Sequence, residues 1–130
     1  MAHTIKYDDT NKIVTTTVID LIKISTSLNI FRDMVQVGRE YNCRLFVLNA
    51  DDAIVNDNFI EVYALFDDLE LYLRKGVDKL AIVHKRQRHI FNLIDSIAIN
   101  HGFMLKSFND NNKAIRWLNF KISPNYHKYK

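Results

Sequence analysis

The sequence predicts one α/β domain: a mixed five-stranded sheet that opens with an antiparallel hairpin and carries helices on both faces. Three observations support this fold class. The chain has 130 residues, and 48% of them are hydrophobic, which suits a single sizeable core. β-branched residues dominate one stretch near the N-terminus, and further along short apolar runs alternate with segments of helical periodicity. Strands that alternate with helices are typical of parallel neighbours joined by right-handed crossovers.

The first two strands are expected at residues 5–7 and 12–19. The second is dense in Val, Ile and Thr, whose branched side chains suit a pleated surface. Asp8, Asp9 and Asn11 lie between the two strands, and such side chains favour turns because they bond to nearby backbone groups. We therefore expect an antiparallel hairpin at the start of the fold.

An amphipathic helix is expected from about Ser27 to Asn42. Apolar residues recur three and four positions apart within this segment, and asparagine suits the left-handed conformation that often follows a helix. Gly38 lies inside the same segment, although glycine costs up to about 1 kcal/mol relative to alanine in a helix. We expect that close packing of this helix against a strand requires the glycine.

Two further strands and two further helices follow. Residues 45–48 and 80–83 are short apolar runs, as expected of strands covered on both faces. A helix with one apolar side is expected between them, and Gly76 is a suitable residue to end it. The next helix has its apolar residues between positions 90 and 98 and is expected to end at Gly102.

The last strand is expected at residues 104–108, and Asp110 can cap a short final helix after it. Trp117 and Leu118 share the apolar side of this helix with Ala114. We therefore expect Trp117 and Leu118 to be core anchors rather than ligand contacts.

Composition restricts the class of protein. The domain is expected to span residues 1–122, and residues 123–130, which lack periodicity, are expected to form a mobile tail. The formal charge is only +3 and the two signs are interspersed, so we expect no nucleic-acid partner. A single cysteine, Cys43, excludes an internal disulfide and a multi-thiolate metal site. The N-terminus lacks the regions of a signal peptide and no apolar run approaches ~20 residues, so a cytoplasmic protein without a transmembrane segment is expected.

The order of these elements, read with particular residues, resembles the STAS family (sulfate transporter and anti-sigma-factor antagonist) and its stand-alone bacterial members. The similarity extends over roughly residues 4–120. In the C-terminal half of this chain, a strand is followed by a helix that ends in Gly, a strand that ends in Phe and a closing Ala-x-x-Trp-Leu helix, which is the pattern of that family. The segments that carry it are Tyr41 to Asn49, Leu80 to Val83, Asn100 to Gly102, Phe108 to Asp110 and Ala114 to Leu118. The resemblance implies a STAS-like fold and a scaffold that binds partners.

One departure from that family concerns its regulatory switch. Anti-sigma-factor antagonists carry a phosphorylatable Ser between the central strand and the helix that follows it. The corresponding stretch here is Asn49-Ala50-Asp51-Asp52-Ala53-Ile54, and neither Ser nor Thr occurs before the second helix. Because a phosphate ester needs a hydroxyl group, we expect the scaffold without the phospho-switch.

The segment from His84 to His89 is the first candidate for a binding site. Lys85, Arg86, Arg88 and His89 follow a buried strand and precede the third helix, so they lie near the N-terminus of that helix. The helix dipole disfavours cations at this end, and the free backbone N–H groups there favour anions. A phosphate, a carboxylate or an acidic partner would relieve the conflict. The alternative is that the long cationic side chains simply extend into solvent.

Asp51 and Asp52 are the second candidate. They are expected directly after the central strand, at the carboxyl edge where open α/β sheets usually bind ligands. The alternative is that these two acids complement the dipole of the second helix.

No local motif indicates catalysis. The five His residues lack metal-ligand spacing, and the three Gly residues are too dispersed for a phosphate loop. We therefore expect no cofactor, no metal site and no enzymatic activity, and the first hypothesis is a non-catalytic regulatory or protein-interaction module. A protein partner is expected, and a homodimer is left open. The alternative is a small-ligand, lipid or anion-binding domain that uses the carboxyl edge of the sheet.

Overall fold

The structure is a computed structural model that describes residues 2–23, 27–55, 59–86 and 88–120. The strands within these residues are β1 (Ala2–Asp8), β2 (Ile13–Ile22), β3 (Leu45–Val55), β4 (Lys79–Val83) and β5 (Met104–Phe108). The helices are α1 (Leu28–Glu40), α2 (Phe59–Leu69), α3 (Arg88–His101) and α4 (Asn111–Asn119). The predicted order of strands and helices is confirmed.

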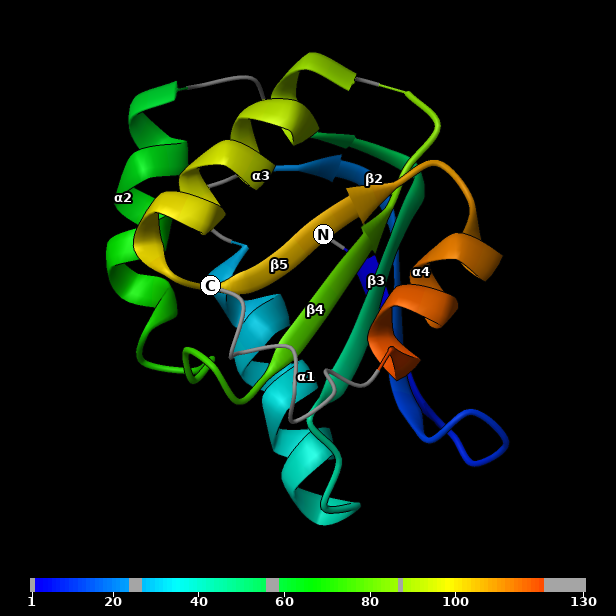
Figure 1. Cartoon of the computed structure of the whole chain (residues 1–130). Coiled ribbons are helices and arrows are strands. Elements are labelled where there is room, and N and C mark those ends of the chain that lie inside the picture. The colour runs from blue at the N-terminus through cyan, green and yellow to red at the C-terminus, as the bar shows by residue number, and fades with distance from the viewer. Residues whose placement is uncertain (1, 24–26, 56–58, 87, 121–130) are drawn as a thin grey trace.

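The five strands form one mixed sheet in the order β1-β2-β3-β4-β5. β1 pairs with β2 in antiparallel orientation, and every other pair is parallel. Because each new parallel strand is added on the same side of the previous one, right-handed crossovers place the connecting helices on one face. Figure 1 shows α1, α2 and α3 on that face and α4 on the other. The predicted fold class is confirmed, with three helices on one face and one on the other.

The opening hairpin is longer than the sequence indicated, but its turn is the predicted one. The Asp8 carboxylate accepts hydrogen bonds from the backbone N–H groups of Thr10 (3.0 Å) and Asn11 (3.2 Å) and from the Asn11 side chain (2.8 Å). Lys12 completes the turn with φ of 59°. Asp8 therefore fixes the register in which β1 and β2 pair.

The main core lies between the sheet and the three-helix layer. Its buried side chains include Val14, Val18, Ile30, Met34, Phe46, Leu48, Val62, Phe66, Leu80, Ile82, Ile94, Ile97 and Leu105. The second helix ends at Leu69, earlier than predicted. Leu73 is nevertheless buried, because the N–H groups of Tyr72 and Leu73 both donate to the Leu69 carbonyl and turn the chain back toward the core.

A smaller core lies under α4, where Ala114 and Leu118 pack with Val47, Ala81 and other side chains of the sheet. As predicted, Asp110 caps this helix by accepting a hydrogen bond from the Asn112 N–H (2.9 Å). The prediction that Trp117 is a core anchor needs correction, because its side chain is only half-buried at the border of this cluster. There its ring meets that of Phe108, with the ring centres 5.7 Å apart. The predicted tail at residues 123–130 lies outside the described residues.

Candidate functional site

His84, the residue that follows β4, lies at the carboxyl edge of the sheet. The N–H of His84 donates to the Phe108 carbonyl (2.9 Å), which continues the pairing of β4 with β5 beyond Val83. The His84 ring is buried, with 6% of the residue exposed, and it stacks on the Phe91 ring of α3 at a centre-to-centre distance of 4.0 Å. His84 therefore belongs to the interior and not to the exposed turn in which the sequence placed it.

His84 also holds the turn that follows it. Its Nδ1 lies 2.9 Å from the carbonyl oxygen of Arg86. A carbonyl can only accept, so Nδ1 carries the hydrogen in this contact. The backbone at Arg86 is thus tied to a buried ring that is itself clamped by Phe91. This contact anchors the backbone at Arg86.

Lys85, Arg86, Arg88 and His89, hereafter the basic turn, are all exposed. None of their side chains has a hydrogen bond or an ion pair within the described part of the chain. Arg88 and His89 open α3, whose first turn contains no acidic residue. The structure therefore places these four residues together, as predicted, at a helix end that favours anions.

Asp51 and Asp52 lie inside β3, which corrects the prediction that they follow the strand. β3 continues to Val55 because β2 continues alongside it. A bulge accompanies this extension, since Thr17 pairs with Asn49 whereas Ile19 pairs with Asp52. No hydrogen bond or ion pair among the described residues joins either aspartate to the basic turn.

Asp51 is held locally. Its N–H donates to the Asn49 side-chain oxygen (3.0 Å), while its own Oδ1 is buried without a hydrogen-bond partner in the described residues. Asp52 is exposed. The two candidate groups thus lie near the same edge of the sheet as separate features, and they do not form one site.

A polar pair behind the basic turn was missed by sequence reasoning. Asp95 on α3 accepts hydrogen bonds from the N–H of Ser107 (2.9 Å) and from its hydroxyl (2.7 Å). Burial raises the pKa of Asp95, against the opposing effect of the Ser107 hydrogen bonds and of the nearby His84 and Lys106. The pair links α3 to β5. Its signal in the sequence is weak: one acid between the apolar residues Ile94 and Ile97.

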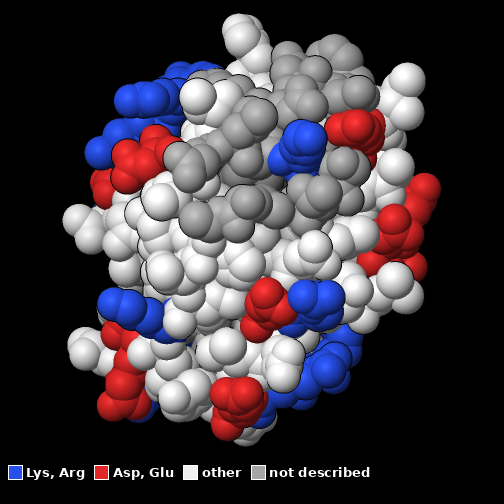
Figure 2. All heavy atoms as spheres, turned by 180° about the vertical axis from the view of Figure 1, so that it is seen from behind, with Lys and Arg blue, Asp and Glu red and all other residues white. Residues whose placement is uncertain are grey.

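The described residues contain no group of three or more His, Cys, Asp or Glu side chains placed to hold a metal ion. Among the same residues, no helix is both long enough and apolar enough to cross a bilayer. On the face seen from behind, acidic side chains lie next to basic ones at several places (Figure 2).

Comparison with solved structures gives a match for the fold. An uncharacterized protein from the DUF3478 family with a SpoIIAA-like fold, from Shewanella loihica PV-4, superimposes with a TM-score of 0.53 at 14% identity. The match covers 90% of this chain and 92% of that one. No family model matches the sequence, and no curated protein matches it. The chain therefore has a SpoIIAA-like, that is STAS-like, fold, as the sequence resemblance implied.

Proposed function

We propose that this chain is a non-catalytic STAS-like interaction module that binds an acidic protein partner through the basic turn. The observation that carries the proposal is the contrast at that turn. The backbone at Arg86 is tied to the buried His84, whereas the side chains of the basic turn are exposed and unpaired among the described residues. A surface held in shape before binding loses less conformational freedom when a partner binds.

The charge pattern supports a protein partner over a nucleic acid. The net charge is +3, with 15 acidic residues among 18 basic ones. A nucleic-acid site needs enough cations to track a phosphate backbone, and binding there loses affinity steeply with salt. Four residues at one turn suit a compact acidic patch on a protein instead.

The alternative of a lipid or apolar ligand inside the fold has less support. The apolar cavity between the three-helix layer and the sheet is about 50 Å³, lined by Ile30, Leu48, Phe66, Ile94 and other core side chains. Ligand pockets commonly measure about 300–1,000 Å³. A cavity of this size is a packing gap within the core.

The regulatory switch of anti-sigma-factor antagonists is not part of the proposal. The stretch that corresponds to the phosphorylated loop of those proteins has no hydroxyl side chain, and from Asn49 to Val55 it is strand. Control of binding by phosphorylation at that position is therefore not expected, and a homodimer remains a separate prediction that sedimentation would test.

Binding of a short polyglutamate peptide at low salt tests the proposal. The variant Lys85→Gln/Arg86→Gln/Arg88→Gln should bind the peptide at least about tenfold more weakly, because exposed cations attract a carboxylate-rich chain at long range. Raised salt should weaken wild-type binding as well. A matched control, Lys6→Gln/Lys113→Gln/Arg116→Gln, removes three other exposed cations and should bind like the wild type. Equal binding by the two triple variants would contradict the proposal.

A further inference from the structure

A cavity of about 140 Å³ opens at the amino-terminal edge of the sheet, opposite the basic turn. Three segments far apart in the sequence meet there: the last turn of α1, the loop that leads into β3, and the connection from α2 to β4. Each segment contributes one arginine, namely Arg39, Arg44 and Arg74. The cavity therefore gathers three guanidinium groups that no sequence motif connects.

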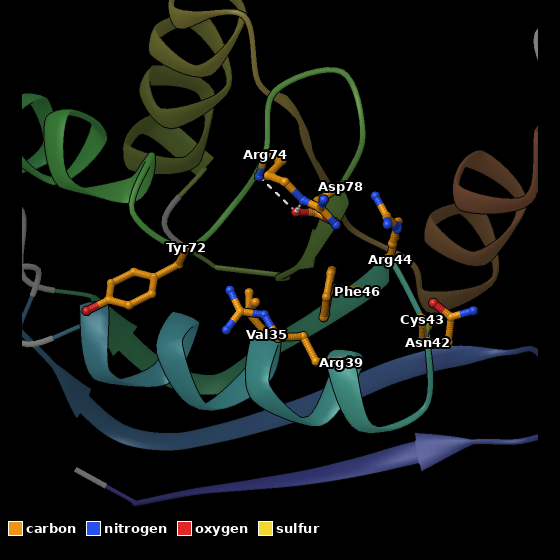
Figure 3. Close-up of a pocket in the computed structure, with 10 residues that line it drawn as sticks. Val35, Arg39, Asn42, Cys43, Arg44, Phe46, Tyr72, Arg74 and Asp78 are labelled. Atoms are coloured by element: carbon orange, nitrogen blue, oxygen red, sulfur yellow. Dashed lines mark hydrogen bonds and ion pairs between the residues drawn. The ribbon is translucent and has the colours of Figure 1, made fainter.

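Figure 3 shows how these side chains are arranged. The Arg74 side chain runs along Asp78 toward Arg44, and Arg39 reaches back along α1 toward Val35. All of them line the same cavity. Arg39 and Arg44 have no hydrogen bond or ion pair through their side chains with any described residue. Two of the three guanidinium groups are thus free to bind an anion.

The third arginine is held by Asp78. The Asp78 side chain is 5% exposed, and its Oδ2 accepts a hydrogen bond from the Arg74 backbone N–H (2.8 Å). The same oxygen lies 3.9 Å from Arg74 Nε. Asp78 therefore fixes the loop that carries Arg74 and offsets part of its charge, and the cavity keeps an excess of positive charge.

One side of the cavity, at Gly38 and Phe46, is apolar and closely packed. The Phe46 ring, which is 1% exposed, lies beside Gly38, where an added Cβ would come within 2.8 Å of it. The Cys43 N–H donates to the Gly38 carbonyl at 2.7 Å and closes the end of α1 against the loop. Charge interactions are stronger beside such a surface than in open solvent.

We propose that this cavity binds a phosphate group carried by a small molecule. A guanidinium group can donate two parallel hydrogen bonds to two phosphate oxygens, and three such groups around one cavity offer more donors than the two oxygens of a carboxylate can use. A volume of 140 Å³ is about ten times what one water molecule requires, so a group of this size fits. The site is separate from the basic turn and does not depend on the function proposed for it.

Titration of the labelled protein with inorganic phosphate at low salt, followed by NMR, tests this site. Saturable shifts are expected for the backbone amides of Cys43 and Arg44 and for the Nε–H signals of Arg39, Arg44 and Arg74. Arg39→Gln/Arg44→Gln should raise the dissociation constant at least about tenfold, because each bond between a guanidinium and an anion is strong. The matched control Lys113→Gln/Arg116→Gln removes the same charge from exposed positions on α4, away from the cavity, and should leave phosphate affinity unchanged.

Unaltered melting temperatures of both double variants would exclude unfolding as the cause of any loss. The proposal is overturned if phosphate gives no saturable shift at the three arginines, or if both double variants lose affinity equally. It is also overturned if a third variant, Lys85→Gln/Arg86→Gln, loses affinity while Arg39→Gln/Arg44→Gln does not, which would place the phosphate at the basic turn. A small molecule that carries phosphate, such as a nucleoside monophosphate, should compete with inorganic phosphate for the cavity and shift the same NMR signals.

Discussion

Gly38 illustrates how a single residue sets the distance between α1 and the sheet. A Cβ added at this position would lie 2.7 Å from the Cys43 carbonyl oxygen and 2.8 Å from Phe46 Cζ. The first of these neighbours is backbone and the second is a fully buried ring, so neither can move away at low cost. The sequence indicated this close approach, because glycine is unfavourable inside a helix and tight packing against a strand would explain its presence there.

Gly38→Ala is expected to destabilise the protein, although alanine is the better helix former. Overpacking costs about 1–3 kcal/mol and the gain in helix propensity returns up to about 1 kcal/mol, so the net loss should be on the order of 1–2 kcal/mol. Urea unfolding measures it. Gln36→Ala, at an exposed position of the same helix, is the control and should unfold like the wild type. A Gly38→Ala protein as stable as the wild type would show that the contact is looser than described.

Asp95 gives a prediction for the pH dependence of stability. Its pKa in the folded protein is raised above the ordinary value of 3.8, mainly by burial. Folding is therefore favoured by the protonated carboxyl. The free energy of unfolding of the wild type, relative to that of Asp95→Asn, should be largest below about pH 3.8 and should fall as the pH rises through the folded pKa.

Asp8 supplies a control of opposite sign for this measurement. The hydrogen bonds from the Asn11 side chain and backbone lower the pKa of Asp8 below 3.8. The wild type should therefore lose stability relative to Asp8→Asn as the pH falls through the folded pKa of Asp8. Urea unfolding between pH 3 and pH 7 gives both differences. A difference for Asp95→Asn that stays constant over this range, or increases with pH, would contradict the assignment.

At the scale of elements, α4 is the helix that covers the second face of the sheet. Its buried contacts come from Ala114 and Leu118, while Trp117 stays half-buried at the border and has the Lys79 ammonium 5.4 Å from its ring centre. The helix therefore depends on a small aliphatic contact more than on its largest side chain.

Leu118→Ala should accordingly destabilise the protein by about 2–5 kcal/mol, because it opens a cavity in a fully packed position. Trp117→Ala should cost less, since that side chain lies at the border of the cluster and part of it already contacts water. Urea unfolding monitored by circular dichroism compares the two variants without relying on tryptophan fluorescence. A greater loss of stability for Trp117→Ala than for Leu118→Ala would show that Trp117 is the main anchor of α4.

For the whole molecule, the sequence was sufficient to predict the order of strands and helices and the STAS-like fold. The period of the apolar residues changes clearly between segments, and Asp8 and Asp110 mark local turns and caps whose hydrogen bonds involve only neighbouring residues. The extension of β3 through Asp51 and Asp52 was not predictable from these residues, because it depends on β2 running alongside.

The candidate sites were predictable only in part. Lys85, Arg86 and Arg88 lie close together in the sequence, so their location at one turn could be predicted. The burial of His84 depends on its contact with Phe91, which lies on the following helix. The arginine cavity joins three segments that only the folded chain brings together, and no spacing in the sequence could indicate it.

The central claim is that the basic turn, held by His84, is the surface that binds an acidic partner. NMR mapping of a titration with a short polyglutamate peptide at low salt tests it most directly. We expect saturable amide shifts at Lys85, Arg86 and Arg88, and no saturable shift on α4. His84→Ala should broaden the signals of the turn and weaken binding, because the contact with the Arg86 carbonyl is lost. Saturable shifts confined to other surfaces, or the absence of any saturable shift, would contradict the claim.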